Sequence, residues 1–157
     1  MRAIARNTAR AAALCCILAV FARADAHDDV MEVFTSMVGA LTEVNGEGDK
    51  TVYGNVAKFM SAISKDMPDY DTLKANVTGL VNNVEISSVV QPIEETDQGE
   101  TYKIDLDWAM DIRSLEQDGP LVRRREILHC ELRKEKKHWK VVSLKPLDFF
   151  ERANLGN

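Results

Sequence analysis

Apolar residues in the first half of the chain recur three and four positions apart, which is the spacing of one helix face. The first stripe consists of Val30, Val33, Phe34, Met37, Val38, Leu41 and Val44. We expect this helix to begin at a cap formed by Asp28 or Asp29 and to stop at Asn45-Gly46. Two shorter stripes follow at residues 56–63 and 70–81. The pattern therefore predicts three helices before any strand.

From Val84 onward the apolar spacing becomes alternating, which is typical of strands. The clearest strand carries Tyr102, Ile104, Leu106, Trp108, Met110 and Ile112 on one face, with mainly charged residues between them. Further strands are predicted to open at Val84, to run over about residues 121–133, and to run over residues 139–144. A polar loop is expected at residues 94–100, and Asp118-Gly119 is expected to form a turn.

The two middle strands are unusually long. At about 12 to 15 residues each, they exceed the usual five or six or so, and strands of this length must twist and bend. Helices that cover the apolar, concave face of such a sheet would enclose a cone. The sequence thus predicts an α+β fold in which N-terminal helices pack on a long, curved antiparallel β-meander.

The last strand reads Trp139-Lys140-Val141-Val142-Ser143-Leu144. With helices first and the meander after them, the segment from about Asp28 to Phe150 resembles the nuclear transport factor 2-like superfamily. The resemblance implies a cone-shaped, cystatin-like fold. Members of that superfamily include ketosteroid isomerase, dehydratases, epoxide hydrolases and polyketide cyclases, as well as non-catalytic dimeric binding domains, so the resemblance implies no single activity.

The first 26 residues have the pattern of a secretory signal peptide. Arg2, Arg6 and Arg10 precede an uncharged run of about 11 residues, and small residues follow in an A-x-A arrangement. The run is well short of the roughly 20 residues of a spanning helix, so no membrane span is expected. We expect residues 1–26 to be removed and residues 27–157 to form a single domain that is secreted or periplasmic.

Two positions satisfy the small-residue rule for cleavage, after Ala24 and after Ala26. Cleavage after Ala24 would leave Asp25-Ala26-His27 at the N-terminus. Its amine, two amides and imidazole could hold divalent copper in a square plane. The simpler interpretation is a polar lead-in to the first helix, and we expect no metal site and no cofactor.

The net charge of the chain limits the partners that it can bind, and its cysteine content limits the disulfides that it can form. Removing residues 1–26 takes away four basic and one acidic side chain, which moves the formal charge from −5 to −8. An acidic domain is a poor nucleic-acid binder, so no nucleic acid is expected. Cys130 would be the one remaining cysteine, which excludes an intrachain disulfide, and its place in the alternation predicts burial.

The third strand offers the candidate ionisable groups of the cone. Counting in phase with Leu128 and Leu132 directs Arg124 and Glu126 inward. Glu126 is the candidate general base, with Arg124 orienting a substrate oxygen, and the alternative is an ion pair at a solvated strand end. An isomerase, dehydratase or hydrolase would need Glu126 to be enclosed.

The inward face of the second strand is otherwise apolar, which departs from the buried carboxylates of ketosteroid isomerase. We therefore expect a non-catalytic domain that binds a small apolar ligand in its cone or acts as a protein-interaction module. The candidate ligand-binding residues are Tyr53, Tyr70, Tyr102, Trp108, Met110, Arg124 and Glu126. The resemblance also implies a homodimer, since members of the superfamily often bury part of the outer sheet face, here marked by Val89 and Ile127.

Overall fold

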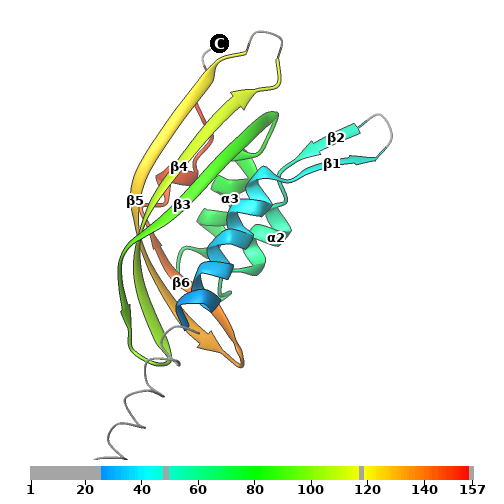
Figure 1. Ribbon diagram of the computed structural model, residues 1–157. Coiled ribbons are helices and arrows are strands. Elements are labelled where there is room, and N and C mark those ends of the chain that lie inside the picture. The colour runs from blue at the N-terminus through cyan, green and yellow to red at the C-terminus, as the bar shows by residue number, and fades with distance from the viewer. Residues whose placement is uncertain (1–25, 48–49, 117–118, 156–157) are drawn as a thin grey trace, which may run out of the picture.

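A four-stranded antiparallel sheet with helices on one face makes up most of the structure (Figure 1). The computed structural model describes residues 26–47, 50–116 and 119–155. The helices span residues 26–42, Val56–Ser61 (α2) and Tyr70–Leu80 (α3). The sheet consists of Val84–Asp97 (β3), Thr101–Ser114 (β4), Leu121–Glu135 (β5) and His138–Lys145 (β6). The predicted α+β fold is confirmed.

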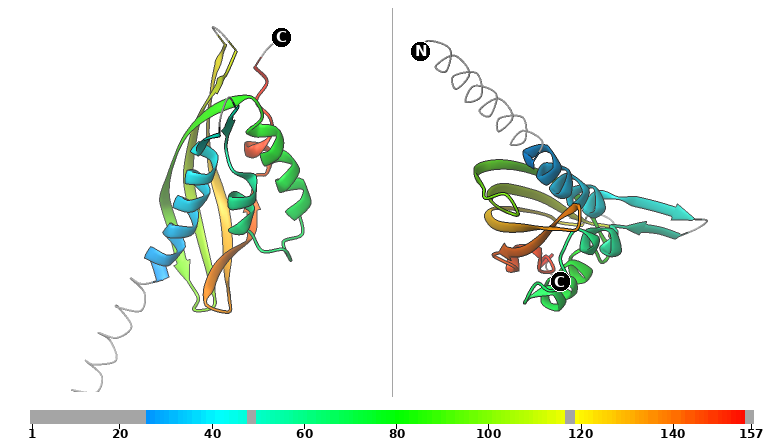
Figure 2. Two further views of the ribbon diagram at one scale, coloured as in Figure 1. Left: turned by 90° about the vertical axis from the view of Figure 1, so that its right-hand side faces the viewer. Right: turned by 90° about the horizontal axis from the view of Figure 1, so that it is seen from below.

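The sheet is a simple meander in the order β3-β4-β5-β6. Its two middle strands have 14 and 15 residues, in agreement with the length expected from the sequence. The strands curve, and the helices lie on the concave side (Figure 2). Apart from Ala26, the predicted signal peptide lies outside the described residues.

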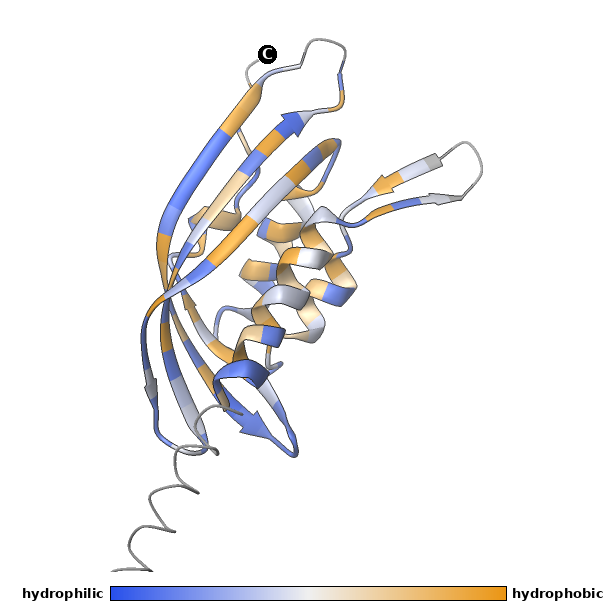
Figure 3. Ribbon diagram, in the orientation of Figure 1, coloured by the Kyte–Doolittle hydropathy of each residue, from blue (hydrophilic) through white to orange (hydrophobic). Residues whose placement is uncertain are grey.

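The concave face of β4 forms the centre of the core. Its six apolar residues, Tyr102, Ile104, Leu106, Trp108, Met110 and Ile112, are all at most 1% exposed. The intervening residues carry the charges seen as alternating blue segments along the strand (Figure 3). In β5, Leu128, Cys130 and Leu132 are buried in the same phase. The alternation predicted for both strands is therefore confirmed where the strands are covered.

The end of the first helix differs from the prediction. Asn45-Gly46 does not stop the helix but lies in Val44–Glu47 (β1), which pairs with Lys50–Tyr53 (β2) in a hairpin that projects from the body (Figure 1). The helix ends at residue 42, and the chain returns at Gly54, whose amide donates to the Glu43 carbonyl at 2.7 Å. Gly54 has φ +71°, a conformation that suits glycine. A hairpin thus interrupts the three predicted helices.

The start of the first helix also lies earlier than predicted. Residues 26–30 are already helical, so neither Asp28 nor Asp29 occupies the cap position. The imidazole Nδ1 of His27 lies 2.8 Å from a carboxylate oxygen of Glu95 in β3. This contact joins the first described turn of the N-terminal helix to the C-terminal end of β3.

The strand that opens the meander is longer than predicted. Residues 94–97, expected in a loop, belong to β3, and the loop is confined to residues 98–100. The register shifts between Pro92 and Glu94, so Ile93 is an extra residue in a β-bulge. The bulge reverses the phase of the strand, so that Pro92 before it and Glu95 after it pair with the inward-facing Leu106 and Ile104.

Two connecting segments complete the body. The outer edge of β6 is covered by the chain after α2, because the Ser64 amide donates to the Val141 carbonyl at 2.8 Å and the Val141 amide donates to the Ala62 carbonyl at 3.0 Å. After β6, the short helix Asp148–Phe150 (η1) turns two phenylalanines toward the concave face. The first segment therefore covers the free edge of β6, and the second covers part of the concave face of the sheet.

Candidate functional site

The interior of the cone is filled by aromatic side chains at the level of Trp108. The Trp108 ring lies 5.4 Å from the Phe150 ring, 6.2 Å from the Phe149 ring and 6.4 Å from the Phe34 ring, measured between centroids. Phe150 also packs on Phe59 of α2 at 5.5 Å. The rings come from the N-terminal helix, α2, β4 and η1, so four elements meet at this point.

Tyr102, Trp108 and Met110 of the predicted ligand site belong to this core. The Tyr102 ring packs on Trp139 at a centroid distance of 5.9 Å. The Trp108 indole nitrogen donates a hydrogen bond of 2.7 Å to the Ser88 hydroxyl. Since Trp108 is 0% exposed, its polar atom is satisfied within the protein.

Arg124 holds the C-terminal segment. Its guanidinium donates to the backbone carbonyls of Phe149 at 2.9 Å, Glu151 at 2.5 Å and Arg152 at 3.1 Å. Burial lowers the pKa of the Arg124 guanidinium, while the nearby carboxylates of Glu151 and Asp148 oppose that shift. The guanidinium that was predicted to orient a substrate oxygen is instead bonded to the backbone of the segment that closes the cone.

Glu126 is exposed to solvent. It pairs directly with Trp108 across the β4–β5 ladder, so it lies on the concave side as the phase predicted. The catalytic hypothesis required this carboxylate to be enclosed, because burial is what raises a carboxyl pKa toward neutrality. That requirement is not met by the exposed side chain.

The two remaining tyrosines lie in different places. Tyr53 is half-buried in β2, opposite Val44 in the projecting hairpin. Tyr70 is half-buried at the first position of α3 and lines a surface cleft. The seven predicted ligand-binding residues are thus not brought together in one site.

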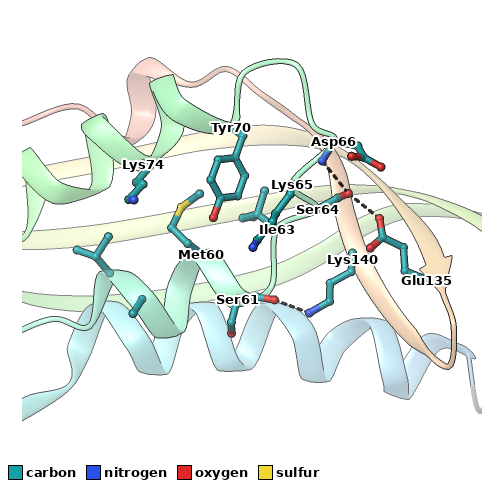
Figure 4. Close-up of a pocket in the computed structure, with 12 residues that line it drawn as sticks. Met60, Ser61, Ile63, Ser64, Lys65, Asp66, Tyr70, Lys74, Glu135 and Lys140 are labelled. Atoms are coloured by element: carbon teal, nitrogen blue, oxygen red, sulfur yellow. Dashed lines mark hydrogen bonds between the residues drawn. The ribbon is translucent and has the colours of Figure 1, made fainter.

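The cleft beside Tyr70 has a volume of about 710 Å³ and is open to solvent. We call it the lateral cleft. It lies between α2 and α3 and is bounded by the segment after α2 and by the ends of β5 and β6 (Figure 4). The lining residues are Val56, Ala57, Met60, Ser61, Ile63, Ser64, Lys65, Asp66, Tyr70, Lys74, Glu135 and Lys140. Its volume falls within the roughly 300–1,000 Å³ typical of small-molecule sites.

Apolar side chains form one part of the lateral cleft. Met60 and Ile63 are buried beneath it, at 5% and 3% exposure, and Val56 is half-buried at the start of α2. Figure 4 shows the Tyr70 hydroxyl pointing into the cleft on the side of Met60. The cleft therefore combines an apolar floor with polar groups at its rim.

A buried serine organises the other end of the cleft. The Ser64 hydroxyl donates to a Glu135 carboxylate oxygen at 2.6 Å, and the Asp66 amide donates to the Ser64 oxygen at 3.3 Å. The hydrogen bond from Ser64 lowers the pKa of Glu135, and Arg133, 3.4 Å away, adds to the shift. Arg133 also lies 3.8 Å from Asp66, so both acids at this end share one guanidinium.

Three lysines surround the lateral cleft. The Lys140 ammonium donates to the Ser61 carbonyl, as Figure 4 shows. Among the described residues, no carboxylate forms an ion pair with Lys65 or Lys74. The α3 side of the cleft is therefore positively charged, whereas the chain as a whole carries a formal charge of −5.

The sequence did not predict the lateral cleft. Lys65 and Lys74 have the features of ordinary surface residues, and Met60 and Ile63 those of a helix face. A usable signal was the spacing of Tyr70 and Lys74, which lie four positions apart and so share one side of α3. Nothing in that spacing shows that α2 leaves a gap beside them.

Other candidate chemistry is limited within the described residues. They contain no cluster of three or more His, Cys, Asp or Glu side chains arranged to hold a metal ion. The Nδ1 atom of His129 lies 2.8 Å from Asp105 on the outer sheet face, and burial raises the pKa of the Cys130 thiol. No helix in this part of the chain is both long and apolar enough to cross a membrane.

A second, smaller cleft of about 280 Å³ lies beside the first, and Ser61 and Lys140 line both. Trp139 also lines it, and the buried Trp139 indole nitrogen has no hydrogen-bond partner among the described residues. Asp29 and Glu32 of the N-terminal helix make this cleft polar. It is a less suitable place for an apolar molecule than the lateral cleft.

Comparison with known proteins supports the fold and leaves the activity open. No protein-family model and no curated protein sequence matches the chain. The structure is similar to that of a conserved protein from Planctomyces limnophilus DSM 3776, with a TM-score of 0.58 and 10% identity over 78% of this chain and 94% of that one. At that identity the likeness shows a shared fold alone.

A second similar structure is a designed variant of the nuclear transport factor 2-like protein Rd1NTF2_05. Its TM-score is 0.38, with 12% identity over 76% of this chain and 96% of the other.

Proposed function

We propose that the protein is an exported, non-catalytic domain that binds a small, largely apolar molecule, and that the lateral cleft is the binding site. The observation that carries the proposal is the cleft itself, which has a ligand-sized volume of about 710 Å³ over the apolar Met60 and Ile63. The cone offers no comparable opening at Trp108, where Phe149 and Phe150 of the same chain occupy the concave side. The ligand therefore binds between the helices rather than inside the cone.

The side chains of the cleft support binding rather than catalysis. Its two carboxylates, Asp66 and Glu135, both lie near the Arg133 guanidinium, and Glu135 also accepts from Ser64. These interactions favour the ionised form of Glu135, which makes it a weak proton acceptor at neutral pH. No histidine is among the residues that line this cleft.

Filling the cleft tests the proposal. Ala57 is an exposed residue of α2 that lines the cleft, so Ala57→Trp should occupy the space without disturbing the core. Ala75→Trp on α3 is the matched control, because Ala75 is also exposed and does not line the cleft. We expect the apolar fluorescent probe N-phenyl-1-naphthylamine to bind the unchanged protein and Ala75→Trp, and to lose most of its binding to Ala57→Trp. Equal binding by the two variants would contradict the proposal.

We also propose that the protein forms a homodimer through the outer face of the sheet. Val89 and Ile127 are 59% and 48% exposed on that face. Around them lie cross-strand ion pairs, such as Arg125 with Asp107 and Arg123 with Asp111. Such a mixed surface suits a polar interface with a small apolar centre. Sedimentation of Ile127→Lys, with Val52→Lys in the exposed hairpin as control, should give a monomer for the first variant alone.

Export is tested by the mature N-terminus. Expression of the full chain in a secreting host, followed by mass spectrometry, should give a protein that begins at Asp25 or His27. A product that keeps Met1 would contradict export. A start at His27 would also remove the amine and amides that a copper site at Asp25-Ala26-His27 requires.

A further inference from the structure

We propose that the ligand of the lateral cleft is a small amphiphilic anion, whose apolar chain lies over Met60 and Ile63 and whose negatively charged head binds Lys65 and Lys74. This inference rests on the proposed function and adds the charge of the ligand to it. It follows from three features of the cleft: the arrangement of its charges, the apolar character of its floor, and the direction of the Tyr70 side chain.

The charges of the cleft are unevenly balanced. At the Glu135 end, the carboxylates of Asp66 and Glu135 face the Arg133 guanidinium, which lies 3.8 Å and 3.4 Å from them. On the α3 side, Lys65 and Lys74 form no ion pair with a described residue. An anion at that side would therefore gain attraction from two ammonium groups without displacing an existing partner.

The apolar floor excludes a small inorganic anion as the best fit. Met60 and Ile63 close the bottom of the cleft. The half-buried Val56 and Tyr70, with the exposed Ala57, present the apolar area that a ligand would remove from water. A phosphate ion would leave the floor wet. A short hydrocarbon chain with a carboxylate or sulfonate head satisfies both parts of the cleft at once.

The Tyr70 side chain links the two parts. Its ring belongs to the apolar lining and its hydroxyl points into the cleft, with Lys74 on the same helix four residues later (Figure 4). A tyrosine in this position can pack its ring on a hydrocarbon chain and donate a hydrogen bond to an acidic head. The sequence analysis predicted Tyr70 as a ligand-binding residue. In the proposed site it acts together with Lys65 and Lys74, which the sequence analysis did not identify.

Three probes of equal chain length separate charge from apolar character: octanoate, 1-octanol and octylammonium. Each is titrated into the ¹⁵N-labelled residues 27–157 produced by secretion or into the full chain, at physiological ionic strength, with amide chemical shifts as the readout. We expect octanoate to bind most tightly and octylammonium least, with the largest shift changes around Met60, Tyr70 and Lys74.

The double variant Lys65→Gln/Lys74→Gln should weaken octanoate binding by roughly two- to tenfold, the range expected for two exposed charges. Its affinity for 1-octanol should not change. The control Lys136→Gln/Lys137→Gln removes the same net charge from the β5–β6 turn, outside the lateral cleft, and should leave both affinities unchanged.

The outcomes separate this inference from the proposed function. If octanoate and 1-octanol bind equally, or if both double variants lose the same octanoate affinity, the anionic ligand is overturned and the apolar site is retained. Octanoate shifts that map away from the cleft also overturn the inference. If none of the probes binds in the cleft and N-phenyl-1-naphthylamine does not bind there either, the proposed function fails as well.

Discussion

The interior of the cone and the lateral cleft are lined by similar apolar residues, yet one is filled and the other is open. In the cone, Trp108 is surrounded by Phe34, Phe149 and Phe150, and it is 0% exposed. In the cleft, Met60 and Ile63 are buried from below while about 710 Å³ of space remains above them. The kind of residue on a face therefore does not decide whether that face can take a ligand.

The difference lies in what crosses each surface. The cone is closed by η1, which follows the last strand and is held in place by Arg124 from β5. The lateral cleft lies between α2 and α3, which are consecutive in the chain, and the segment between them turns away to pair with Val141 of β6. The cone is thus filled by η1, a segment distant in sequence from β4, whereas the short connection between α2 and α3 leaves the lateral cleft open.

The largest expected effect is in the cone. Phe150→Ala removes a fully buried ring that contacts Trp108 and Phe59, and should cost about 3–5 kcal/mol of unfolding free energy, measured by urea denaturation. Met60→Ala, at the edge of an open cleft that water can enter, should lie near the low end for such a truncation, about 2 kcal/mol. Equal losses would mean that the cleft floor is as enclosed as the cone, which would remove the contrast between the two regions.

The closure of the cone should depend on Arg124. Arg124→Met keeps much of the side-chain volume and removes the guanidinium that donates to three carbonyls, so we expect a loss of about 2–3 kcal/mol in urea denaturation. The control is Arg123→Met, because the Arg123 side chain is 75% exposed and its guanidinium pairs with one carboxylate, that of Asp111, at 3.4 Å. Stabilities that are the same for both variants would show that the three carbonyl bonds do not hold η1 in place.

The polar end of the lateral cleft gives a smaller, pH-dependent effect. Ser64→Ala removes a buried hydroxyl that donates to Glu135 and should cost about 1–2 kcal/mol at pH 7. The hydrogen bond holds the pKa of Glu135 below its ordinary value of 4.5, so its contribution is fully present above about pH 5.5 and is lost as the pH falls through the folded pKa. The stability difference between the two proteins should therefore shrink at pH 3. A difference that is the same at pH 7 and pH 3 would argue against ionised Glu135 as the acceptor.

The smallest effect is expected on the outer sheet face, which borders neither the filled cone nor the open lateral cleft. Arg125 donates to Asp107 at 2.8 Å and lowers the pKa of that carboxyl, but the pair is exposed. In the Ile127→Lys background, where we expect a monomer with this face exposed, Arg125→Met should change the melting temperature only slightly at low salt, and the change should vanish at 1 M NaCl because salt screens exposed charges. A large effect that persists in salt in this background would contradict a solvent-exposed ion pair.

Much of the fold could be predicted from the sequence because its signals are local. The alternation from Tyr102 to Ile112 predicted the buried face of β4, and the burial of Leu128, Cys130 and Leu132 followed from the same period. A side chain's face in a strand depends only on its position in the pleat, so it can be counted along the chain. The length of the middle strands, and hence the need for a curved sheet, was equally visible.

The candidate site could be predicted only in part. Tyr70 was predicted to bind a ligand and lines the lateral cleft, whose ligand binding is our proposal. The phase that placed Glu126 and Arg124 on the concave side agrees with the strand register. The bulge at Ile93 and the hairpin after Glu43 escaped prediction, because each depends on the strand that pairs with it. Lys65 and Lys74 had no feature that distinguished them from other surface lysines.

The sequence by itself determined which residues of a strand share one face of the sheet, while the tertiary structure decided which parts of those faces meet solvent. Arg124 and Glu126 have the same phase and are two positions apart, yet Arg124 contacts the carbonyls of η1 and Glu126 is exposed. Their difference arises from where residues 149–152 cross β5, more than 20 positions later in the chain. Packing between distant segments leaves no periodic trace in the sequence, and it is this packing that filled the cone and left the lateral cleft open.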